Sequence, residues 1–394
     1  MTIQRLAGTD VDVLVVGGGP GGLHAARCLA RDGFRVLVCE EHPTVGDPVH
    51  CTGVIAADAF DEFDLPRHPM LNPLTRIRFV SPSGLTVGYT SAAPEAIVID
   101  RGRFDRALAD EAAKAGAEVR LNARVHGLTV TQAGAQGEVG GAIIRARLVV
   151  LACGASYGVQ RRLGLGLPAA YLHTAQRELR ATRLHDVEVH FGHDVAPSGF
   201  AWAVPVDRPE GAHVRVGVMA SGDAGGHFSR MVTRIADRWG IQPDGVRPRL
   251  KMLPLGAIPR TYATRLLAVG DAAGLVKPTT GGGIYYSIVS ASLAADVGGR
   301  ALKRDRLDEE ALASYEARWR SRLAREFDAQ HALRRVATEM TDRDIDALFD
   351  LARTNGVMPL IRRTAKFNEH RHLIRALFKH PPARRVLFRS LAGC

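Results

Sequence analysis

Three glycines near the N-terminus have the spacing that a nucleotide pyrophosphate requires. Gly17, Gly19 and Gly22 form a G-x-G-x-x-G pattern with Pro20 inside it. In this pattern the glycines allow a tight turn, a close approach of the backbone to the phosphates, and close packing of a helix on a strand. Glu40 follows about twenty residues later, where a carboxylate can accept hydrogen bonds from a ribose diol. These residues predict a dinucleotide-binding site.

The flanking sequence predicts the elements that would position this motif. Val11–Val16 is an apolar, β-branched run of strand length, Leu23–Arg31 has helical periodicity, and Phe34–Cys39 is a second apolar run. A helix that begins at the glycines points its N-terminal N–H groups and the positive end of its dipole at the phosphates. The order of strand, glycine turn, helix, strand and acid favours nucleotide binding, but it does not distinguish FAD from NAD.

A second acidic residue at a strand end favours FAD. The predicted buried strand Arg265–Val269 leads into Gly270 and Asp271. A carboxylate in a glycine-rich turn suits a second polyol, such as the ribityl chain of a flavin, which NAD lacks. The next turn opens a predicted helix whose N-terminal amides can stabilise negative charge on a reduced flavin ring. This turn contains Gly281, Gly282, Gly283 and Ile284.

The composition is that of a globular protein with an excess of positive charge. The 394 residues are 46% hydrophobic, and the formal net charge is +11. Such a charge indicates an acidic partner, which is a membrane surface, a diphosphate or nucleic acid. The sequence has no basic motif with interleaved aromatic residues and no zinc-ligand spacing, so we predict no nucleic-acid partner and no metal site.

The five cysteines indicate a reducing compartment. Cys28, Cys39, Cys51, Cys153 and Cys394 are scattered and include no C-x-x-C pair. The N-terminus leads directly into the first predicted strand, which leaves no room for a signal peptide, and no apolar run reaches the roughly 18 residues of a membrane span. We therefore expect a cytoplasmic protein whose contact with a membrane, if it has one, is peripheral and at the inner face.

Several motifs together resemble the FAD-dependent geranylgeranyl reductase family. That family is one of the glutathione-reductase-like flavoproteins with a p-hydroxybenzoate-hydroxylase-type fold. The resemblance extends from residue 1 to about residue 300 and fades in the tail. The motifs that carry it are the Gly17–Gly22 turn with Glu40, Arg101–Asp105, Gly270–Gly274 followed by Pro278–Ile284, Phe200–Pro205, and His50–Gly53.

The resemblance implies an α/β fold in three parts. These are a discontinuous Rossmann-type FAD-binding domain, an inserted antiparallel β-sheet substrate domain and a helical C-terminal region. We expect the FAD-binding domain to consist of residues 1–72, 97–165 and 260–300. Residues 73–96 and 166–259 would form the substrate domain, and residues 301–394 the helical C-terminal region.

The resemblance also implies a reductase that transfers hydride from reduced flavin to isolated double bonds of a prenyl chain. The implied substrates are geranylgeranyl diphosphate, a prenyl lipid or a menaquinone tail. Such an alkene has no carbonyl to polarise, so a proton must reach one carbon while hydride reaches the other, in a dry cavity. His50–Gly53 is similar to the family's Cys-x-Gly loop beside the flavin. Cys51 is the first candidate for the proton donor or its helper, and His50, Tyr285 and Tyr286 are weaker candidates.

Other site residues follow from the same resemblance. Phe200, Trp202 and Pro205 belong to a segment similar to the family's aromatic motif on the substrate sheet, and we expect them to line the pocket for an apolar chain. Arg101 or Arg103 is expected to contact the pyrophosphate. The chain has no second G-x-G-x-x-G pattern, so the expected electron donor is external and is NADPH, a ferredoxin or a quinol.

Two positions depart from the family pattern. Cys153–Gly154 stands where the third flavin motif usually has Asp-Gly, which puts one polar contact to the cofactor in doubt. Val204 replaces a typical aromatic residue, which changes the expected shape of the pocket.

Three other functions remain open from the sequence. An FAD-dependent monooxygenase, or hydroxylase, shares the implied fold. A flavin halogenase shares it too, but it needs a catalytic lysine beyond the first strand–helix–strand unit, and this chain has no lysine before Lys114, which disfavours halogenation. The third is a flavoprotein that holds FAD structurally and binds a lipid.

The arginine-rich tail from Leu302 to Cys394 has two interpretations. Residues 373–379 and 384–389 combine apolar residues with cations, as helices at a membrane interface do. We favour a helical cap over the substrate domain, because amphipathic helices usually face a core.

Overall fold

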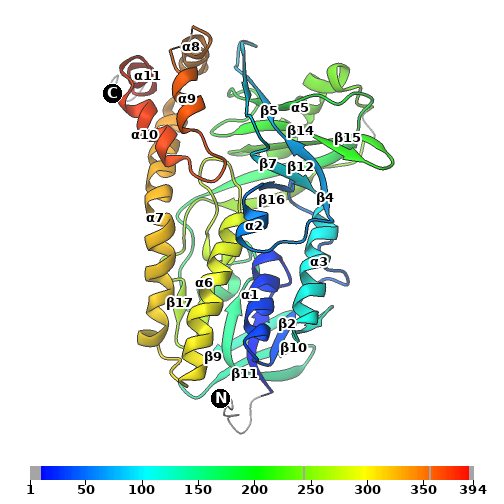
Figure 1. Cartoon of the computed structure of the whole chain (residues 1–394), viewed down its shortest axis with the longest axis vertical. Helices are drawn as coiled ribbons and strands as arrows, with labels where there is room; N and C mark the ends of the chain where they lie inside the picture. The colour runs from blue at the N-terminus through cyan, green and yellow to red at the C-terminus, as the bar shows by residue number, and fades with distance from the viewer. Residues whose placement is uncertain (1–9, 243–244, 355, 390–394) are drawn as a thin grey trace.

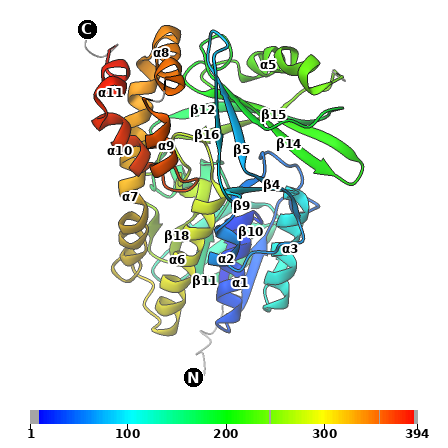
Figure 2. The same ribbon diagram turned by 45° about the horizontal axis from the view of Figure 1, so that its top comes forward.

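The computed structural model describes residues 10–242, 245–354 and 356–389. The expectations for the first nine residues and for Cys394 therefore lie outside the described residues. Figures 1 and 2 show a parallel sheet with its helices at the N-terminal end of the molecule, a second sheet at the opposite end, and a long helix that runs beside both.

A parallel sheet carries the glycine motif. Its strand order is β18-β11-β1-β2-β8, with parallel pairing throughout, and a short antiparallel strand, β17, forms one edge. Most side chains of β1, β2 and β18 are fully buried, as is usual for the apolar strands of a parallel sheet covered on both faces. The bounds are β1 Val11–Val16, β2 Val36–Cys39, β8 Glu118–Arg120, β11 Ala142–Leu151, β17 Tyr262–Ala263 and β18 Leu266–Ala268.

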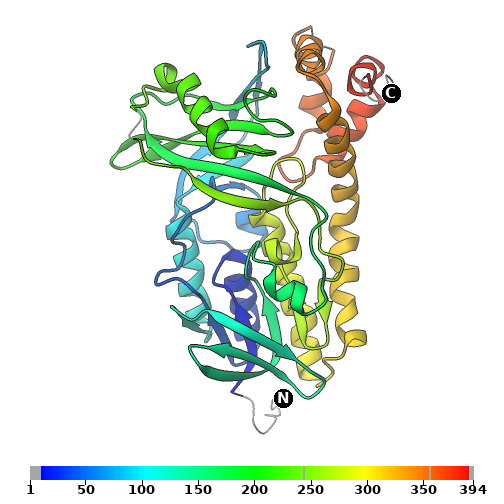
Figure 3. The ribbon, with the colours of Figure 1, turned by 180° about the vertical axis from the view of Figure 1, so that it is seen from behind.

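Three helices cover one face of this sheet, and two further strands cover the other. Figure 1 shows α1 (Pro20–Arg31), α3 (Arg101–Lys114) and α6 (Ile284–Lys303) side by side. Figure 3 shows the opposite face, where β9 (Val125–Val130) and β10 (Ala135–Val139) continue antiparallel from β11. At Gly137 an added Cβ would lie 2.6 Å from Leu14 Cδ2, so β10 packs directly on β1. The predicted elements at residues 11–16, 23–31 and 34–39 are confirmed, with small shifts of their ends.

A seven-stranded sheet forms the second layer of the fold. Its order is β16-β12-β15-β14-β13-β5-β6, and α5 (Ala224–Trp239) packs on one face. The sheet is antiparallel except for the parallel pair β5 and β13. These two strands come from separate insertions, so the long connection that parallel neighbours need runs through the nucleotide-binding part of the chain. The bounds are β5 Arg76–Val80, β6 Thr86–Thr90, β12 Tyr171–Arg180, β13 Val187–His190, β14 Phe200–Arg208, β15 Gly211–Ala220 and β16 Arg249–Pro254.

A small antiparallel sheet joins the two large sheets. It has the order β3-β7-β4. Short helical turns lie in the connections, including η1, which follows β18 directly. The bounds are β3 Val54–Ala56, α2 Ala59–Glu62, β4 Met70–Leu74, β7 Ala96–Ile99, α4 Gly158–Arg162 and η1 Gly270–Ala273.

The C-terminal region is helical. Helix α7 (Glu309–Glu339) packs against α6 and β17 and buries Tyr315 and Trp319 there, and its far end continues into a bundle of four short helices. A capping box formed by Thr341 and Asp344 begins the first of these. The bundle consists of α8 Asp342–Arg353, α9 Met358–Thr364, α10 Arg371–Lys379 and α11 Pro381–Leu387. Among the described residues, none of the helices combines the length and apolarity that crossing a bilayer requires.

We propose that the domain boundaries follow those expected from the sequence. The parallel sheet is built from strands in residues 1–72, 97–165 and 260–300, and most of the seven-stranded sheet comes from residues 73–96 and 166–259. Strand β4 crosses the proposed boundary at residue 72. The residues from 301 to 389 that are described form only helices and their connections.

Candidate active site

One continuous cavity of about 1230 Å³ runs through the middle of the molecule. It begins at the glycine turn after β1, passes the turn before α6 and ends among α8, α10 and α11. Typical small-molecule pockets have about 300–1,000 Å³. The volume is therefore large enough for more than one bound group.

The first end of the cavity is the glycine turn between β1 and α1. Gly17 has φ +108°, and a Cβ at Gly22 would lie 2.1 Å from the Gly17 carbonyl oxygen, so both positions require glycine. At Gly19 an added Cβ would meet nothing within 4 Å, because this residue faces the cavity. Helix α1 begins at Pro20 and has no side-chain cap among the described residues. Its first N–H groups are therefore available to an anion.

Glu40 directly follows β2 beside this turn and is nearly buried, with 9% of its surface exposed. Its Oε2 accepts a hydrogen bond from Gly18 N at 2.7 Å, and its Oε1 accepts one from His42 N at 3.0 Å. These backbone donors fix the carboxylate at the cavity wall. His42 Nδ1 also lies 2.5 Å from Oε1. Because each carboxylate oxygen has two lone pairs, acceptor capacity for a ribose hydroxyl remains on Oε2.

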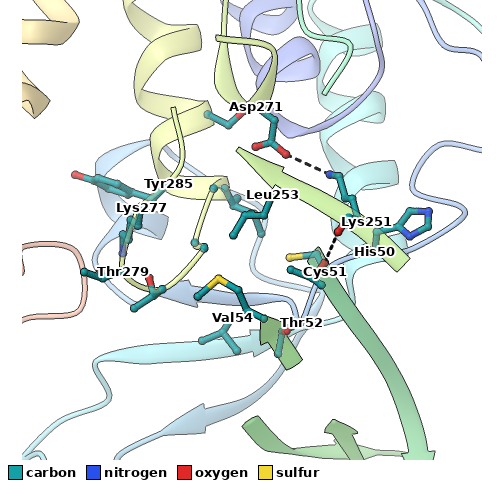
Figure 4. Close-up of a pocket in the computed structure, with 18 of the residues that line it drawn as sticks. His50, Cys51, Thr52, Val54, Lys251, Leu253, Asp271, Lys277, Thr279 and Tyr285 are labelled. Carbon is teal, nitrogen blue, oxygen red and sulfur yellow. Dashed lines mark hydrogen bonds and ion pairs between the residues drawn. The ribbon is translucent and has the colours of Figure 1, made fainter. Parts of the chain in front are cut away.

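The second acid lies at the start of η1, where the cavity turns toward α6. Asp271 Oδ2 pairs with Lys251 Nζ at 3.2 Å, and Figure 4 shows the two side chains pointing toward one another. A Cβ at Gly283 would lie 2.9 Å from Asp271 Oδ1, so this glycine lets the end of the turn approach the carboxylate. Helix α6 follows at Ile284 without a side-chain cap among the described residues. Asp271, Gly281, Gly282, Gly283 and Ile284 all line the cavity.

The His50–Gly53 loop lies across the cavity from this helix start. Cys51 Sγ accepts a hydrogen bond from Gly53 N at 3.3 Å, and Gly53 has φ +68°. The loop is held on the seven-stranded sheet, because Thr52 Oγ1 donates to Gln176 Oε1 at 2.9 Å. Partial desolvation, together with the nearby cations Lys251 and Arg249, lowers the pKa of His50. A neutral imidazole is therefore favoured there at neutral pH, and it is a poor proton donor.

Tyr285 and Arg101 line the cavity, and their polar groups already have partners in the protein. The Tyr285 hydroxyl donates to Glu62 Oε2 at 2.9 Å and accepts from Arg322 at 3.1 Å, and burial raises its pKa to about 12. The Arg101 guanidinium forms two hydrogen bonds to Asp105, at 3.1 and 2.7 Å.

Four expected site residues do not line the cavity formed by the described residues. Arg103 is exposed on α3, and Pro205 is buried within β14. Tyr286 is buried and borders a separate, smaller pocket. Gly270 has φ +58°, and a Cβ there would lie 2.3 Å from Ser287 Oγ, so this glycine allows α6 to pack closely on η1.

Aromatic rings form the wall beyond the Cys51 loop. Phe200 and Trp202 of β14 have ring centroids 5.7 Å apart, and Phe191 lies 6.3 Å from Phe200. Phe349 of α8 packs edge-on against Phe191 at 6.1 Å. The Trp202 Nε1 atom is buried and has no hydrogen-bond partner among the described residues. This arm of the cavity therefore suits an apolar ligand.

The C-terminal half of this wall carries no sequence motif. Apolar side chains of α7, α8 and α10 line the same cavity. They have helical periodicity but no motif, so the sequence could indicate only that they face a core. These residues are Leu333, Ile345, Leu348, Phe349, Leu373 and Leu377.

The C-terminal segment also holds the loop before α6, a contact that no sequence motif indicates. Lys277 is 2% exposed, and its Nζ donates to the Phe367 carbonyl at 2.7 Å and to Asn368 Oδ1 at 2.8 Å. Burial lowers the pKa of Lys277 to about 7. Thr279 Oγ1 lies 2.9 Å from both Gln330 Oε1 and His370 Nδ1. Hydrogen bonds to the C-terminal segment thus fix this loop at the cavity wall.

Comparisons with known proteins agree with this geometry. The family model described as "Lycopene cyclase protein" matches residues 12–384. The digeranylgeranylglycerophospholipid reductase of Methanocaldococcus jannaschii is 31% identical over 361 residues, which is 86% of this chain and 89% of that protein. The protein of the same name from Methanosarcina acetivorans is 31% identical over 399 residues, covering 93% of both chains.

This chain belongs to the FAD-dependent geranylgeranyl reductase family. A crystal structure of a geranylgeranyl bacteriochlorophyll reductase-like protein from Thermoplasma acidophilum is similar in fold to this member of the reductase family. Its TM-score is 0.84, with 25% sequence identity and coverage of 97% of this chain and 98% of that one. A flavin-containing halogenase structure matches with a TM-score of 0.68 at 15% identity, which shows a shared fold only. The predicted fold class is confirmed.

The residues present in this reductase-family chain fit FAD. The tight space at Gly22 and the open space at Gly19 leave a backbone cradle at the start of α1, as a pyrophosphate requires. Two helix N-termini without side-chain caps among the described residues, those of α1 and α6, face one cavity. Two carboxylates, Glu40 and Asp271, line the same cavity. When bound, FAD would be held by these groups.

Proposed function

We propose that this protein is an FAD-dependent reductase that saturates isolated double bonds of an isoprenoid chain. The observation that carries the proposal is the single cavity, which joins the dinucleotide cradle to an arm lined by aromatic and aliphatic side chains. The names of the relatives support it, because they describe reductases that act on geranylgeranyl groups.

The protein's own residues would orient the alkene and exclude water. Reduced FAD, when bound, supplies the hydride. Phe191, Phe200 and Trp202 provide a dry wall for the prenyl chain. The N-terminal amides of α6 stabilise negative charge at the adjoining part of the cavity. Proton transfer to the second alkene carbon is assigned to Cys51, whose Sγ is held by Gly53 N at the cavity wall.

The direct test is the mass of the product. The protein is loaded with FAD, reduced with dithionite, and incubated with geranylgeranyl diphosphate or with a geranylgeranyl ether phospholipid in vesicles. We expect a gain of two hydrogens for each double bond reduced. A product that gains one oxygen would indicate a hydroxylase instead. Unchanged substrate with a fully reducible flavin would leave only a structural role for FAD.

The name of the matching family model gives a second candidate. A lycopene cyclase rearranges a long isoprenoid without changing its mass, and the apolar arm of the cavity suits such a chain as well. Incubation with lycopene under the same reducing conditions separates the two activities. A product of equal mass and altered chromatographic retention would favour cyclisation.

The role of Cys51 is tested by substitution. We expect Cys51→Ala to slow reoxidation of reduced flavin by the prenyl substrate about 10²- to 10⁴-fold, the usual contribution of general acid catalysis. Reduction of the flavin by dithionite should keep its wild-type rate. Cys28→Ser on α1, which lies outside the cavity, is the matched control. Wild-type reoxidation by Cys51→Ala would assign the proton to another donor, and His50→Gln and Tyr285→Phe would then be measured.

The electron donor is external in this proposal and is NADPH, a ferredoxin or a quinol. Anaerobic mixing of the FAD-loaded protein with each donor, followed by loss of flavin absorbance, identifies which of them reduces it.

A peripheral membrane contact is part of the proposal, because prenyl lipids reside in bilayers. Residues 357–389 contain nine arginines and lysines and a single acid, Glu369. Many of these cations are exposed on α9, α10 and α11, the helices beside the apolar end of the cavity. We expect salt-sensitive sedimentation with anionic vesicles. Binding should weaken in a double variant carrying Arg384→Glu and Arg385→Glu and persist in Arg234→Glu on α5. Equal sedimentation of both variants would exclude this surface.

A further inference from the structure

The cations that line the cavity fall into two groups. Eight arginine and lysine side chains belong to its wall, and five of these lie within 4.0 Å of a carboxylate. The other three have no carboxylate within that distance among the described residues, and they are Arg162, Lys277 and Arg334. The five paired cations are Arg76, Arg101, Arg124, Lys251 and Lys366.

Arg334 is the only one of these three that lies on the apolar arm with donors to spare. Arg162 is on α4, on the nucleotide-binding side, where it approaches the His126 carbonyl. The Lys277 ammonium is enclosed by the Phe367 carbonyl, Asn368 and the Phe367 ring, whose centroid is 4.7 Å away. Arg334 lies on α7 among Leu333, Ala337 and Thr338, all of which line the cavity.

The structure holds the Arg334 guanidinium in place without neutralising it. Its Nη1 donates to the Pro278 carbonyl at 3.2 Å and its Nη2 to the Ser198 carbonyl at 2.7 Å. These two bonds join α7 to the loop before α6 and to the loop before β14. A guanidinium has five N–H groups, so three have no partner among the described residues. Loss of hydration lowers the pKa of Arg334, and in the part of the chain that the structure describes no carboxylate opposes this effect.

We propose that Arg334 binds the phosphate of the prenyl substrate and makes the enzyme selective for chains with an anionic head group. This inference rests on the proposed function and adds a residue that determines specificity. A cation that is partly desolvated without a counter-ion is costly, and a bound phosphate would remove that cost. The planar fork of arginine matches two phosphate oxygens at once. The aromatic and aliphatic side chains around it would hold the chain that the phosphate carries.

The test compares two ligands that differ only in the head group. Geranylgeranyl diphosphate and geranylgeraniol are assayed for kcat/KM with the wild type, Arg334→Gln and Arg334→Lys. Glutamine keeps N–H donors for the two carbonyls but has no charge, and lysine keeps the charge. We expect Arg334→Gln to lower kcat/KM for the diphosphate about 10- to 100-fold, which corresponds to a lost hydrogen bond between charged groups. The value for the alcohol should change less than about threefold, and Arg334→Lys should lie between the wild type and Arg334→Gln.

Arg335→Gln is the matched control, because Arg335 is the next residue of α7, is exposed and does not line the cavity. This variant should keep the wild-type kcat/KM for both ligands. Equal losses for the diphosphate and the alcohol in Arg334→Gln would show that Arg334 only supports the fold and would overturn the inference. A ratio of kcat/KM values for the diphosphate and the alcohol that stays at its wild-type value would also overturn the inference.

A second set of assays identifies the source of the phosphate. The same variants are assayed with a geranylgeranyl ether phospholipid in vesicles. If Arg334→Gln lowers kcat/KM for only one of the two substrates, the soluble diphosphate or the phospholipid, then Arg334 binds the head group of that substrate. If the wild type reduces none of these ligands, the proposed function fails. Equilibrium binding of geranylgeranyl diphosphate against geranylgeraniol still decides the role of Arg334, because it needs no turnover.

Discussion

Two glycines of the same turn have different surroundings. A Cβ at Gly22 would overlap the Gly17 carbonyl oxygen at 2.1 Å, whereas a Cβ at Gly19 would enter open space in the cavity. The first position therefore limits how the chain packs, and the second limits what the cavity can hold.

This difference predicts separate effects of two alanine substitutions. Gly22→Ala should lower the melting temperature of the protein without cofactor, because backbone atoms must move. Gly19→Ala should leave that temperature within about 1 °C, because the added Cβ meets no other atom within 4 Å, but it should weaken FAD binding. Calorimetry of the apoprotein and fluorescence titration with FAD measure the two effects. Equal melting temperatures for the two variants would contradict the packing argument.

Lys277 carries a charge that folding removes from water. Burial lowers its pKa to about 7 from an ordinary value of 10.5, and Glu326 and Asp58 oppose this shift only in part. The other groups around it are neutral near pH 8, because burial lowers the pKa of His370 to about 4 and raises that of Tyr286.

This shift predicts that the lysine affects stability in a defined pH range. Between pH 7 and pH 10.5 the unfolded chain binds a proton at Lys277 that the folded chain does not, so stability from this group increases as the pH rises. The melting temperature of the wild type minus that of Lys277→Met should rise by at least about 2 °C from pH 7 to pH 10. Lys379→Met, an exposed lysine on α10, is the control. A constant difference across this range would mean that Lys277 keeps an ordinary pKa in the folded state.

Among the elements, α8 has an apolar face that lines the cavity and an exposed face. Leu348 and Phe349 point to the cavity wall, whereas Asp350 is exposed. The helix is held at its start by the Thr341 capping box, and Asp346 accepts hydrogen bonds from Ser81 and Ser83 in the turn after β5. The position of α8 is thus fixed from two sides.

A larger side chain on this helix should shorten the apolar arm of the cavity. Leu348→Trp is expected to lower kcat/KM for geranylgeranyl diphosphate more than for geranyl diphosphate, because only the longer chain needs the far end of the cavity. Asp350→Trp on the exposed face should affect neither substrate. If Leu348→Trp lowered both values equally, α8 would not contact the prenyl chain.

In the whole molecule, segments far apart in sequence meet at one cavity. The glycine turn at residues 17–22, the loop at 277–283 and helix α7 all contribute to its wall. Figure 1 shows α7 running beside both the nucleotide-binding sheet and the second sheet. A ligand at the junction should therefore stabilise distant segments together.

Hydrogen exchange provides the measurement at this scale. Adding FAD should slow amide exchange at the starts of α1 and α6 at the same concentration, because one ligand contacts both. Exchange in α5, which packs on the other face of the second sheet, should not change. Protection of α1 alone would show that the ligand occupies only the dinucleotide end.

The residue types and their spacing were enough to predict the local geometry around the cofactor. The order of β1, glycine turn, α1 and β2 was correct. Glu40 and Asp271 both line the cavity, and their contact with FAD stays a prediction. A tight turn and a helix start depend on φ angles and backbone N–H groups of adjacent residues, which a motif specifies directly. The strand β12, the parallel pairing of β5 with β13 and the true surroundings of Arg103 and Pro205 were not predicted.

The tertiary structure alone decided which residues share the cavity. Leu348 and Phe349 face it because α8 is anchored on the turn after β5. Among the described residues no carboxylate packs within 4.0 Å of Arg334, whose guanidinium instead donates to backbone carbonyls. The sequence shows the apolar periodicity of a helix, but it does not show the surface against which the apolar face of that helix packs. The spacing of the amino acids therefore determined the backbone of the cofactor cradle, and long-range packing determined which side chains line the apolar arm.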